Sequence, residues 1–286
     1  MPQVPRHATI IIPTHDHGLT LRYPLAGLKQ QTLSDFQAYV IGDGVPEALK
    51  PALRELVADD ERFHFLDHPK HERRGEPYRH EVLRHAADGI VCYLCDRDIW
   101  LPDHLEQMWE LLQSADYAHS LPLHILPDGG YRAFPVDLSY AGYRWMMCTF
   151  NDNRIPLSCF AHSLDAYRRL PEGWATTPSN FWTDLHMFRK FFANESLRGA
   201  SGLSPTSATF PSPPRKEWSN GQRLAELQSW WQRLASDSGR AAFERAILKV
   251  TIRAQREEAV RLSEHAQQLQ QQLNLRKGAE FWRNAV

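Results

Sequence analysis

The chain has 286 residues, of which 42% are hydrophobic and 23% charged, as in an ordinary soluble globular protein. Its 33 basic and 34 acidic side chains nearly cancel, so the composition does not point to nucleic acid or an anionic membrane as a partner. No apolar run approaches the roughly 20 residues that span a bilayer, the N-terminus lacks the apolar core of a signal peptide, and four cysteines are too few for a disulfide framework. We therefore expect a cytoplasmic protein.

The first third of the chain alternates short apolar runs with longer stretches of helical periodicity. Strands are predicted at Ala8–Ile12, Phe36–Ile41, Arg62–Leu66 and Ile90–Leu94. Helices are predicted at Leu19–Gln31, Pro46–Ala58, Glu76–Ala87 and Pro102–Ser114. This alternation predicts an α/β fold, Rossmann-like, with a mostly parallel central sheet and helices on both of its faces.

The rest of the chain divides into a mixed segment and a helical end. Strands are predicted at Gly130–Phe134 and Arg144–Cys148, helices at Leu164–Arg169 and Phe181–Ala193, and a connector rich in proline and serine at Ser201–Arg215. From Ser219, which can form a capping box with Gln222, apolar residues follow a heptad-like spacing that is broken once, at Asp237–Gly239. We expect a helical appendage that packs on the domain or on another copy of the chain.

Polar residues follow three of the predicted strands, at the edge where parallel sheets bind their ligands. Thr14 follows the first strand, Asp43 the second, and Asp96 and Asp98 the fourth. Two aspartates two apart can both turn toward one cation if the backbone leaves extended geometry. Mg²⁺ or Mn²⁺ in such a site usually shares its oxygen ligands with substrate phosphates. The alternative is a solvated turn, with Asp98 or Asp103 at the positive end of the next helix.

Further motifs occur in a fixed order along the segments 8–47 and 75–104. The chain reads Ile-Ile-Ile-Pro-Thr-His-Asp at 10–16, Val-Ile-Gly-Asp-Gly at 40–44, Gly-x-x-x-Arg-His at 75–80 and Tyr-Leu-Cys-Asp-Arg-Asp-Ile-Trp-Leu-Pro-Asp at 93–103. In this order and spacing the motifs resemble the family 2 glycosyltransferases, which have the type-A nucleotide-sugar fold. The resemblance covers the first 110 residues well and the next hundred loosely. The helical C-terminus lies outside it.

The resemblance implies a division of the chain and a role for each strand-end residue. Residues 1–114 would form the nucleotide-sugar half, 115–214 the acceptor-side half of the same catalytic domain, and 215–286 a helical extension. Asp43 would accept a hydrogen bond from the nucleotide base, in a pocket lined by Thr14. Arg79 would support the nucleotide or diphosphate, Asp96 would face the sugar or ribose, and Asp98, with Asp96, would bind the metal. Asp43 with the next glycine is also a good turn, and Arg79 could be a solvated helix residue.

The resemblance also implies a catalytic base. An inverting sugar transfer needs a carboxylate that takes the proton from the acceptor hydroxyl. Family members place it at the start of a helix well after the metal motif, and the segment Phe181–Arg189 looks like that helix start. This implies that Asp184 is the general base; the alternative is that Asp184 only favours the positive end of the helix.

Four residues depart from the family pattern. His15 replaces the usual tyrosine, Gly42 replaces the first aspartate of the base-binding pair, and Thr209 occupies the neighbourhood in which relatives can carry a metal-assisting histidine. Arg97 stands where the family commonly has a third carboxylate. The Arg97 cation could weaken metal binding by repulsion or could itself hold a phosphate.

The sequence thus predicts a glycosyltransferase. We expect it to transfer a sugar from a nucleotide-diphosphate donor, UDP-linked, to a hydroxyl of a glycan, lipid or protein, with inversion and with help from Mn²⁺ or Mg²⁺. Nucleic acid and a membrane span are not expected, and the C-terminal helices could join two copies of the chain. The alternative is a catalytically degenerate domain that binds a nucleotide-sugar, or nothing, and acts as an assembly module; Gly42, Arg97 and Thr209 favour it.

Overall fold

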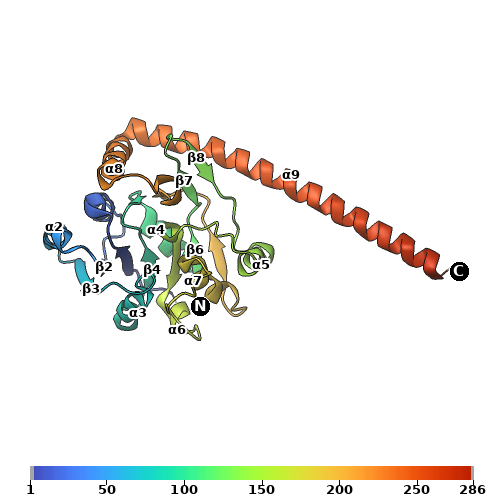
Figure 1. The fold of residues 1–286 in the computed structure, drawn as a ribbon, viewed down its shortest axis with the longest axis horizontal. Helices are drawn as coiled ribbons and strands as arrows, with labels where there is room; N and C mark the ends of the chain where they lie inside the picture. Colours follow the sequence, from blue (N-terminus) through green and yellow to red (C-terminus); the bar gives the residue numbers. More distant parts are fainter. Residues whose placement is uncertain (1–2, 285–286) are drawn as a thin grey trace.

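A seven-stranded sheet forms the centre of the protein, a computed structural model of which describes residues 3–284 (Figure 1). Its strands are, from edge to edge, β10 (Gly199–Ser201), β6 (Tyr117–His119), β9 (Phe160–Ser163), β4 (Ile90–Tyr93), β1 (Ala8–Thr14), β2 (Phe36–Asp43) and β3 (Phe63–His68). Strand β9 runs antiparallel to both of its neighbours, and the other pairs are parallel. The mostly parallel sheet predicted from the sequence is confirmed.

Helices cover both faces of this sheet, as the alternation of strands and helices predicted. Successive residues of a strand point to opposite faces, so β1 contributes to two cores. Ile11 packs in the core beneath α3 (Glu76–His85), α5 (Ala141–Thr149), α6 (Leu164–Arg168) and α7 (Thr183–Phe192). Ile10 and Ile12 pack in the opposite core, beneath α1 (Arg22–Lys29), α2 (Lys50–Ala58) and α4 (His104–Leu112). Short 3-10 helices connect these elements: η1 (Gly18–Leu21), η2 (Glu47–Leu49), η3 (Leu157–Cys159) and η4 (Pro213–Arg215).

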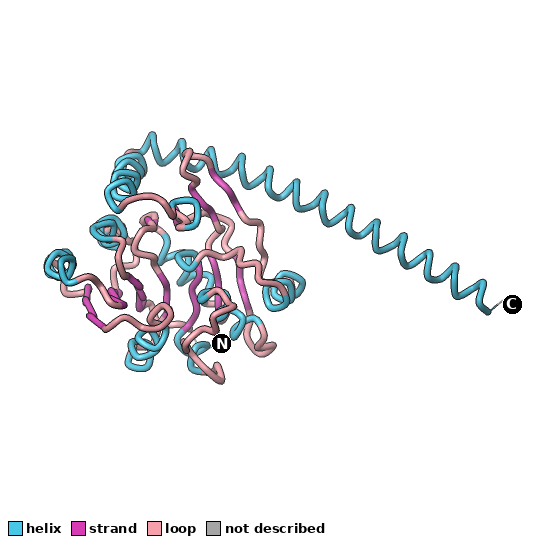
Figure 2. Tube along the Cα trace, in the orientation of Figure 1, coloured by secondary structure: helices cyan, strands magenta, loops and turns pink. Residues whose placement is uncertain are grey.

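The C-terminal helices pack on a separate third core. Two small sheets contribute to it, the hairpin of β7 (Leu123–Ile125) with β8 (Tyr131–Ala133) and the pair of β5 (Ile99–Trp100) with β11 (Ser207–Ala208). Helix α8 (Asn220–Ala235) adds Leu227, Trp230 and Leu234, and the start of α9 (Asp237–Asn284) adds Phe243 and Ile247. The remainder of α9 then extends away from the body (Figures 1 and 2).

Local predictions for the second half held in part. The capping box of Ser219 and Gln222 is present at the start of α8, and the two C-terminal helices separate at Ser236, next to the predicted break. The predicted strand at Arg144–Cys148 is wrong, because this segment lies inside helix α5. Only Met147 of α5 is buried. A helix with one buried face satisfies this pattern, whereas a strand covered on both faces would bury successive residues.

No helix within residues 3–284 has both the length and the apolar character that crossing a membrane requires.

Candidate active site

The tips of β1, β2 and β4 bring the predicted residues to one edge of the sheet. The three strands are parallel and β1 lies between the other two, so their carboxyl ends meet there. Thr14 ends β1, Asp43 ends β2, and Asp96 and Asp98 follow β4. All four residues are at most 5% exposed, which means that each side chain must find polar partners inside the protein.

Asp96 is held from the β1 side of this edge. Thr14 Oγ1 donates a hydrogen bond of 2.8 Å to one of its carboxylate oxygens, and His17 Nδ1 lies 2.9 Å from the other. Burial acts to raise the pKa of Asp96, but the hydrogen bond and charge of His17, the charge of Arg97 and the Thr14 hydroxyl outweigh it, and the pKa is lowered. Asp96 is therefore a fixed anion whose oxygens are already engaged.

Asp98 turns to other partners than Asp96. Ser158 Oγ donates a hydrogen bond of 2.5 Å to one of its oxygens, and the backbone N–H of Phe210 donates one of 2.8 Å to the other. The hydroxyl of Thr209, beside Phe210, donates a hydrogen bond to the carbonyl of Leu123.

The residues after β4 do not fit a divalent metal ion as they are placed. A Mg²⁺ or Mn²⁺ site needs several convergent oxygen ligands. Every oxygen of Asp96 and Asp98 faces a protein donor, and in residues 3–284 there is no group of three His, Cys, Asp or Glu side chains that could hold a metal.

Asp43 is covered by the loop that follows β3. Lys70 Nζ donates a hydrogen bond of 2.6 Å to one oxygen of Asp43, and the backbone N–H of His71 donates one of 2.6 Å to the other. Gly75, which precedes α3, has φ +68°, and a Cβ on it would meet Asp43 Cβ at 3.2 Å. The loop can close over Asp43 because glycine tolerates this conformation and this approach.

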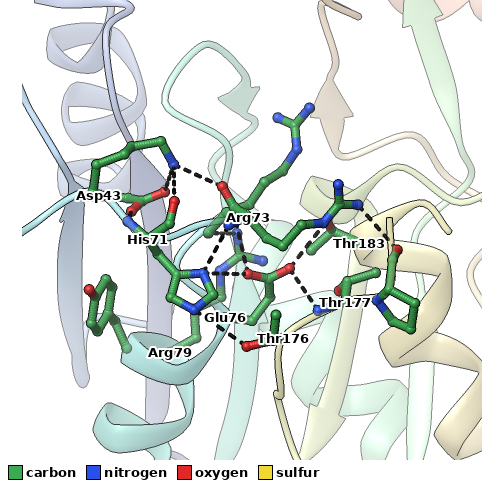
Figure 3. A network of polar contacts seen from close by, with 12 residues as sticks. Asp43, His71, Arg73, Glu76, Arg79, Thr176, Thr177 and Thr183 are labelled. Carbon is green, nitrogen blue, oxygen red and sulfur yellow. Dashed lines mark hydrogen bonds and ion pairs between the residues drawn. The ribbon is translucent and has the colours of Figure 1, made fainter. Parts of the chain in front are cut away.

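Glu76, which sequence reasoning used only as a helix boundary, is the centre of a buried polar network (Figure 3). One of its oxygens accepts a 2.9 Å hydrogen bond from the backbone N–H of Arg74. The other oxygen accepts longer bonds from the Thr177 backbone (3.4 Å) and the Thr183 hydroxyl (3.5 Å). Burial acts to raise the pKa of Glu76, but these bonds, its own backbone N–H and the charge of Arg79 lower it. An ionised Glu76 therefore ties the start of α3 to the start of α7.

Arg79 is buried beside this network with unused donors. Its guanidinium lies 4.6 Å from the ring centre of Trp174, and Nη2 donates to the Arg74 carbonyl at 2.8 Å. Its Nε and Nη1 have no hydrogen-bond partner among residues 3–284, although the side chain is 2% exposed. Unpaired buried N–H groups of a cation are costly, so an anionic ligand at this position would satisfy them.

Asp184 is the second residue of α7 and shares the surroundings of these arginines. No hydrogen bond to its carboxylate is present within residues 3–284, and burial and neighbouring charges are the leading influences on it. Burial raises the pKa of Asp184 above its ordinary value, although the charges of Arg79, Arg74 and Arg97 oppose this effect. The charges of Arg79 and Arg97 thus both act on the carboxylate of Asp184, at the start of α7.

Several of these partners escaped sequence reasoning. From the sequence, His17 is most simply an ordinary hydrogen-bonding histidine, and Lys70 belongs to a basic loop, residues 68–74, that is either solvated or gathers an anionic substrate. Ser158 carries no signal, because it lies 60 residues from the carboxylate that it holds. Glu76 had one usable signal, since a carboxylate directly after a glycine at a helix start is a common anion position.

Comparisons with known proteins identify the family and the fold. The family model described as glycosyl transferase family 2 matches residues 9–163, which is more than half of the chain. No curated protein sequence matches it.

Solved structures of S. aureus TarS share the fold. Crystal structures of TarS residues 1–349, alone and in complex with UDP-GlcNAc, are both 12% identical to the chain with a TM-score of 0.54. Each covers 81% of this chain, while the chain spans 66% and 67% of their lengths. A longer TarS structure gives a TM-score of 0.51, and the chain spans only 43% of its length.

At 12% identity the likeness to TarS shows the fold alone, a central sheet of the same kind with helices on both faces. The family match covers the strand-end residues from Thr14 to Asp98 but not Asp184, at the start of α7. The chain therefore belongs to glycosyl transferase family 2.

Proposed function

We propose that this protein transfers a sugar from a nucleotide-diphosphate donor to the hydroxyl of a glycan, lipid or protein acceptor, with inversion at the anomeric carbon. The observation that carries the proposal is the position of Asp184: a carboxylate with a raised pKa at the start of α7, on which the charge of the buried and partly unpaired guanidinium of Arg79 acts. A base and an anion site side by side are what this reaction needs.

The reaction follows from these positions. The acceptor hydroxyl gives its proton to Asp184 while its oxygen attacks the anomeric carbon from the face opposite the diphosphate. Arg79 binds a phosphate oxygen through the donors that have no protein partner. The bond between the anomeric carbon and the diphosphate breaks with its electron pair on the phosphate oxygen. A raised pKa suits Asp184, because a stronger base takes the proton more readily.

The nucleotide would lie against Thr14 and Asp43, at the tips of β1 and β2. Asp43 is occupied by Lys70 and the His71 backbone, so a base that bonds to Asp43 must displace the loop 69–74. We propose UDP as the nucleotide. The UDP-GlcNAc complex of TarS, a protein of the same fold, supports this choice.

The function is tested by replacing the base. Asp184→Asn keeps the size of the side chain and removes its ability to accept a proton, so we expect the rate of sugar transfer or donor hydrolysis to fall about 100-fold or more. The measurement is UDP release from UDP-sugars, and Asp165→Asn, an exposed aspartate near the start of α6, is the matched control. Full activity of Asp184→Asn with an unchanged melting temperature would refute the role.

A second candidate function is a degenerate domain that binds a nucleotide-sugar without transferring it. The carboxylates after β4, both engaged by protein donors, favour this candidate because they do not form the expected metal site. Calorimetric titration separates the two: UDP binding without any turnover of a panel of UDP-sugars, with every acceptor class tried, would favour the degenerate domain. Turnover of one donor would exclude it.

A further inference from the structure

Arg97 is a cation that lies in sequence between two aspartates, Asp96 and Asp98. Neither carboxylate is free to bind a second cation. Asp96 is engaged by Thr14 and His17, and Asp98 by Ser158 and the backbone of Phe210. A divalent ion that recruited either carboxylate would have to share or displace these buried donors. The positive charge in this position is therefore already supplied by the chain itself.

The guanidinium of Arg97 is anchored and keeps donors to spare. Its Nε donates to the Phe210 carbonyl at 3.1 Å, and Nη1 lies 3.5 Å from an oxygen of Asp96. A guanidinium has five N–H donors, and within residues 3–284 no other acceptor contacts it. The side chain is 24% exposed, so the remaining donors are open to a ligand. Their planar fork matches the oxygens of a phosphate.

The surroundings of Arg97 are those of the proposed reaction. An arginine guanidinium stays protonated at any pH at which proteins are folded, and Nη1 of Arg97 lies 3.5 Å from an oxygen of the ionised Asp96. The same charge acts on Asp184, together with that of Arg79, whose buried Nε and Nη1 have no partner among residues 3–284. Two guanidinium groups that have unused hydrogen-bond donors, those of Arg79 and Arg97, thus act through their charge on the carboxylate of Asp184.

We propose that Arg97 takes the place of the divalent cation: its guanidinium binds the diphosphate of the donor, and donor binding needs no metal ion. The inference rests on the proposed function. As the acceptor oxygen bonds to the anomeric carbon and its proton passes to Asp184, the carbon–oxygen bond to the diphosphate breaks. The electron pair stays on the phosphate oxygen, and Arg97 stabilises the charge that this oxygen gains.

Calorimetric titration of the full chain with UDP, and in parallel with GDP, CDP and dTDP, tests the proposal in EDTA and in Mn²⁺. For the nucleotide that binds, we expect a Kd that differs by no more than about twofold between the two conditions. Arg97→Gln, which keeps a donor for the Phe210 carbonyl but lacks the charge, should weaken binding about ten- to a hundredfold. The Kd of Arg97→Lys should lie between those of the wild type and Arg97→Gln, because a lysine keeps the positive charge but lacks the planar fork of N–H donors. Arg84→Gln, on the exposed surface of α3, is the matched control and should bind as the wild type does.

Three results would count against the proposal, and they are distinguishable. Binding that tightens tenfold or more with Mn²⁺ would overturn the metal-free role of Arg97 while leaving the proposed function intact. An unchanged Kd in Arg97→Gln, with a wild-type melting temperature, would overturn diphosphate binding by Arg97 and would also leave the proposed function intact. If none of the four nucleotides binds to the wild type in either condition, the proposed function fails, and this inference fails with it.

Discussion

The pKa of Asp184 is set by opposing effects of its surroundings. Burial raises its pKa, whereas Arg79, Arg74 and Arg97 lower it, so the value depends on each cation that remains. A general base works only when it is ionised, and a raised pKa means that activity must fall already at a pH above the ordinary value of an aspartate. The acidic limb of the rate profile therefore reports on the arginines around the base.

Removing one of these cations should move that limb in a defined direction. In Arg79→Gln the carboxylate of Asp184 loses the largest of the effects that lower its pKa, so the limb of kcat/KM should shift to higher pH by about one unit. The measurement is kcat/KM for the active UDP-sugar between pH 4 and 9, with Arg84→Gln, exposed on the same helix, as the control. A limb that stays in place or moves to lower pH would show that Asp184 is not the titrating base.

Glu76 acts between elements, because it joins the first turns of α3 and α7. It is fully buried and accepts hydrogen bonds from Arg74, Thr177 and Thr183, and its pKa is lowered in the folded protein. A carboxylate whose pKa is lower when folded stabilises the protein above its unfolded pKa, and this contribution is lost as the pH falls through the folded pKa. The tie should therefore hold at neutral pH and weaken in acid.

Glu76→Gln removes the charge and should lower the free energy of unfolding by about 1–3 kcal/mol at pH 7. The difference from the wild type should shrink as the pH falls below about 4.5, the ordinary pKa of a glutamate. Below this pH the unfolded wild-type side chain takes up a proton while the folded one stays ionised, which favours the unfolded state of the wild type only. Urea unfolding at pH 7 and pH 4 measures both, and Glu81→Gln, exposed on α3, is the matched control. A loss of stability that is equal at the two pH values would contradict the electrostatic account.

The elements with strong periodicity were predictable and the weakly patterned ones were not. The apolar run at Ile10–Ile12 can lie only in a strand covered on both faces, and it does. The segment Arg144–Cys148 was mistaken for a strand because Trp145, which is apolar but 62% exposed, hides the single inward face of a helix. Helix α5 is set by its packing on α7, which local sequence does not encode.

The candidate site shows the same division. Strand-end position alone located Thr14, Asp43 and Asp96, since parallel strands converge by geometry. The engagement of Asp98 could not be predicted, because Ser158 and Phe210 lie 60 and 112 residues away in the chain. Sequence spacing suggests which carboxylates could bind a cation; only the fold determines which donors reach them first.

At the scale of the whole molecule, α9 is the element without an intramolecular explanation. Its first turns pack on the third core from Phe243 to Ala254, and Glu258 still lies 3.4 Å from Arg154 of the body; the rest of the helix extends away from the body (Figure 1). Large apolar side chains are exposed along α9: Leu248, Ile252, Val260, Leu262, Leu269 and Leu273, each at least 44% exposed. All of them except Val260 fall on the a and d positions of one heptad register, with Gln255, Ala259 and Ala266 at the positions between. Such a seam is typical of a coiled coil, and an isolated helix of this kind is marginal in water.

We expect the seam to pair with the same seam of a second copy, so that the chain forms a dimer of about 66 kDa, twice its 33.0 kDa mass. Leu262→Glu with Leu269→Glu would place four charges in the dimer seam. Burial of a leucine contributes about 1.5–3 kcal/mol, so the double variant should run as a monomer at micromolar concentration. Light scattering coupled to gel filtration gives the mass directly, and Gln267→Glu, on the outer face of the same helix turn, should remain dimeric. Because the seam lies outside the strand-tip site, the monomeric variant should bind UDP as the wild type does. A wild-type mass of 33 kDa at 100 μM would refute self-association through α9, and a monomeric variant that lost UDP binding would show that the second copy contributes to the site.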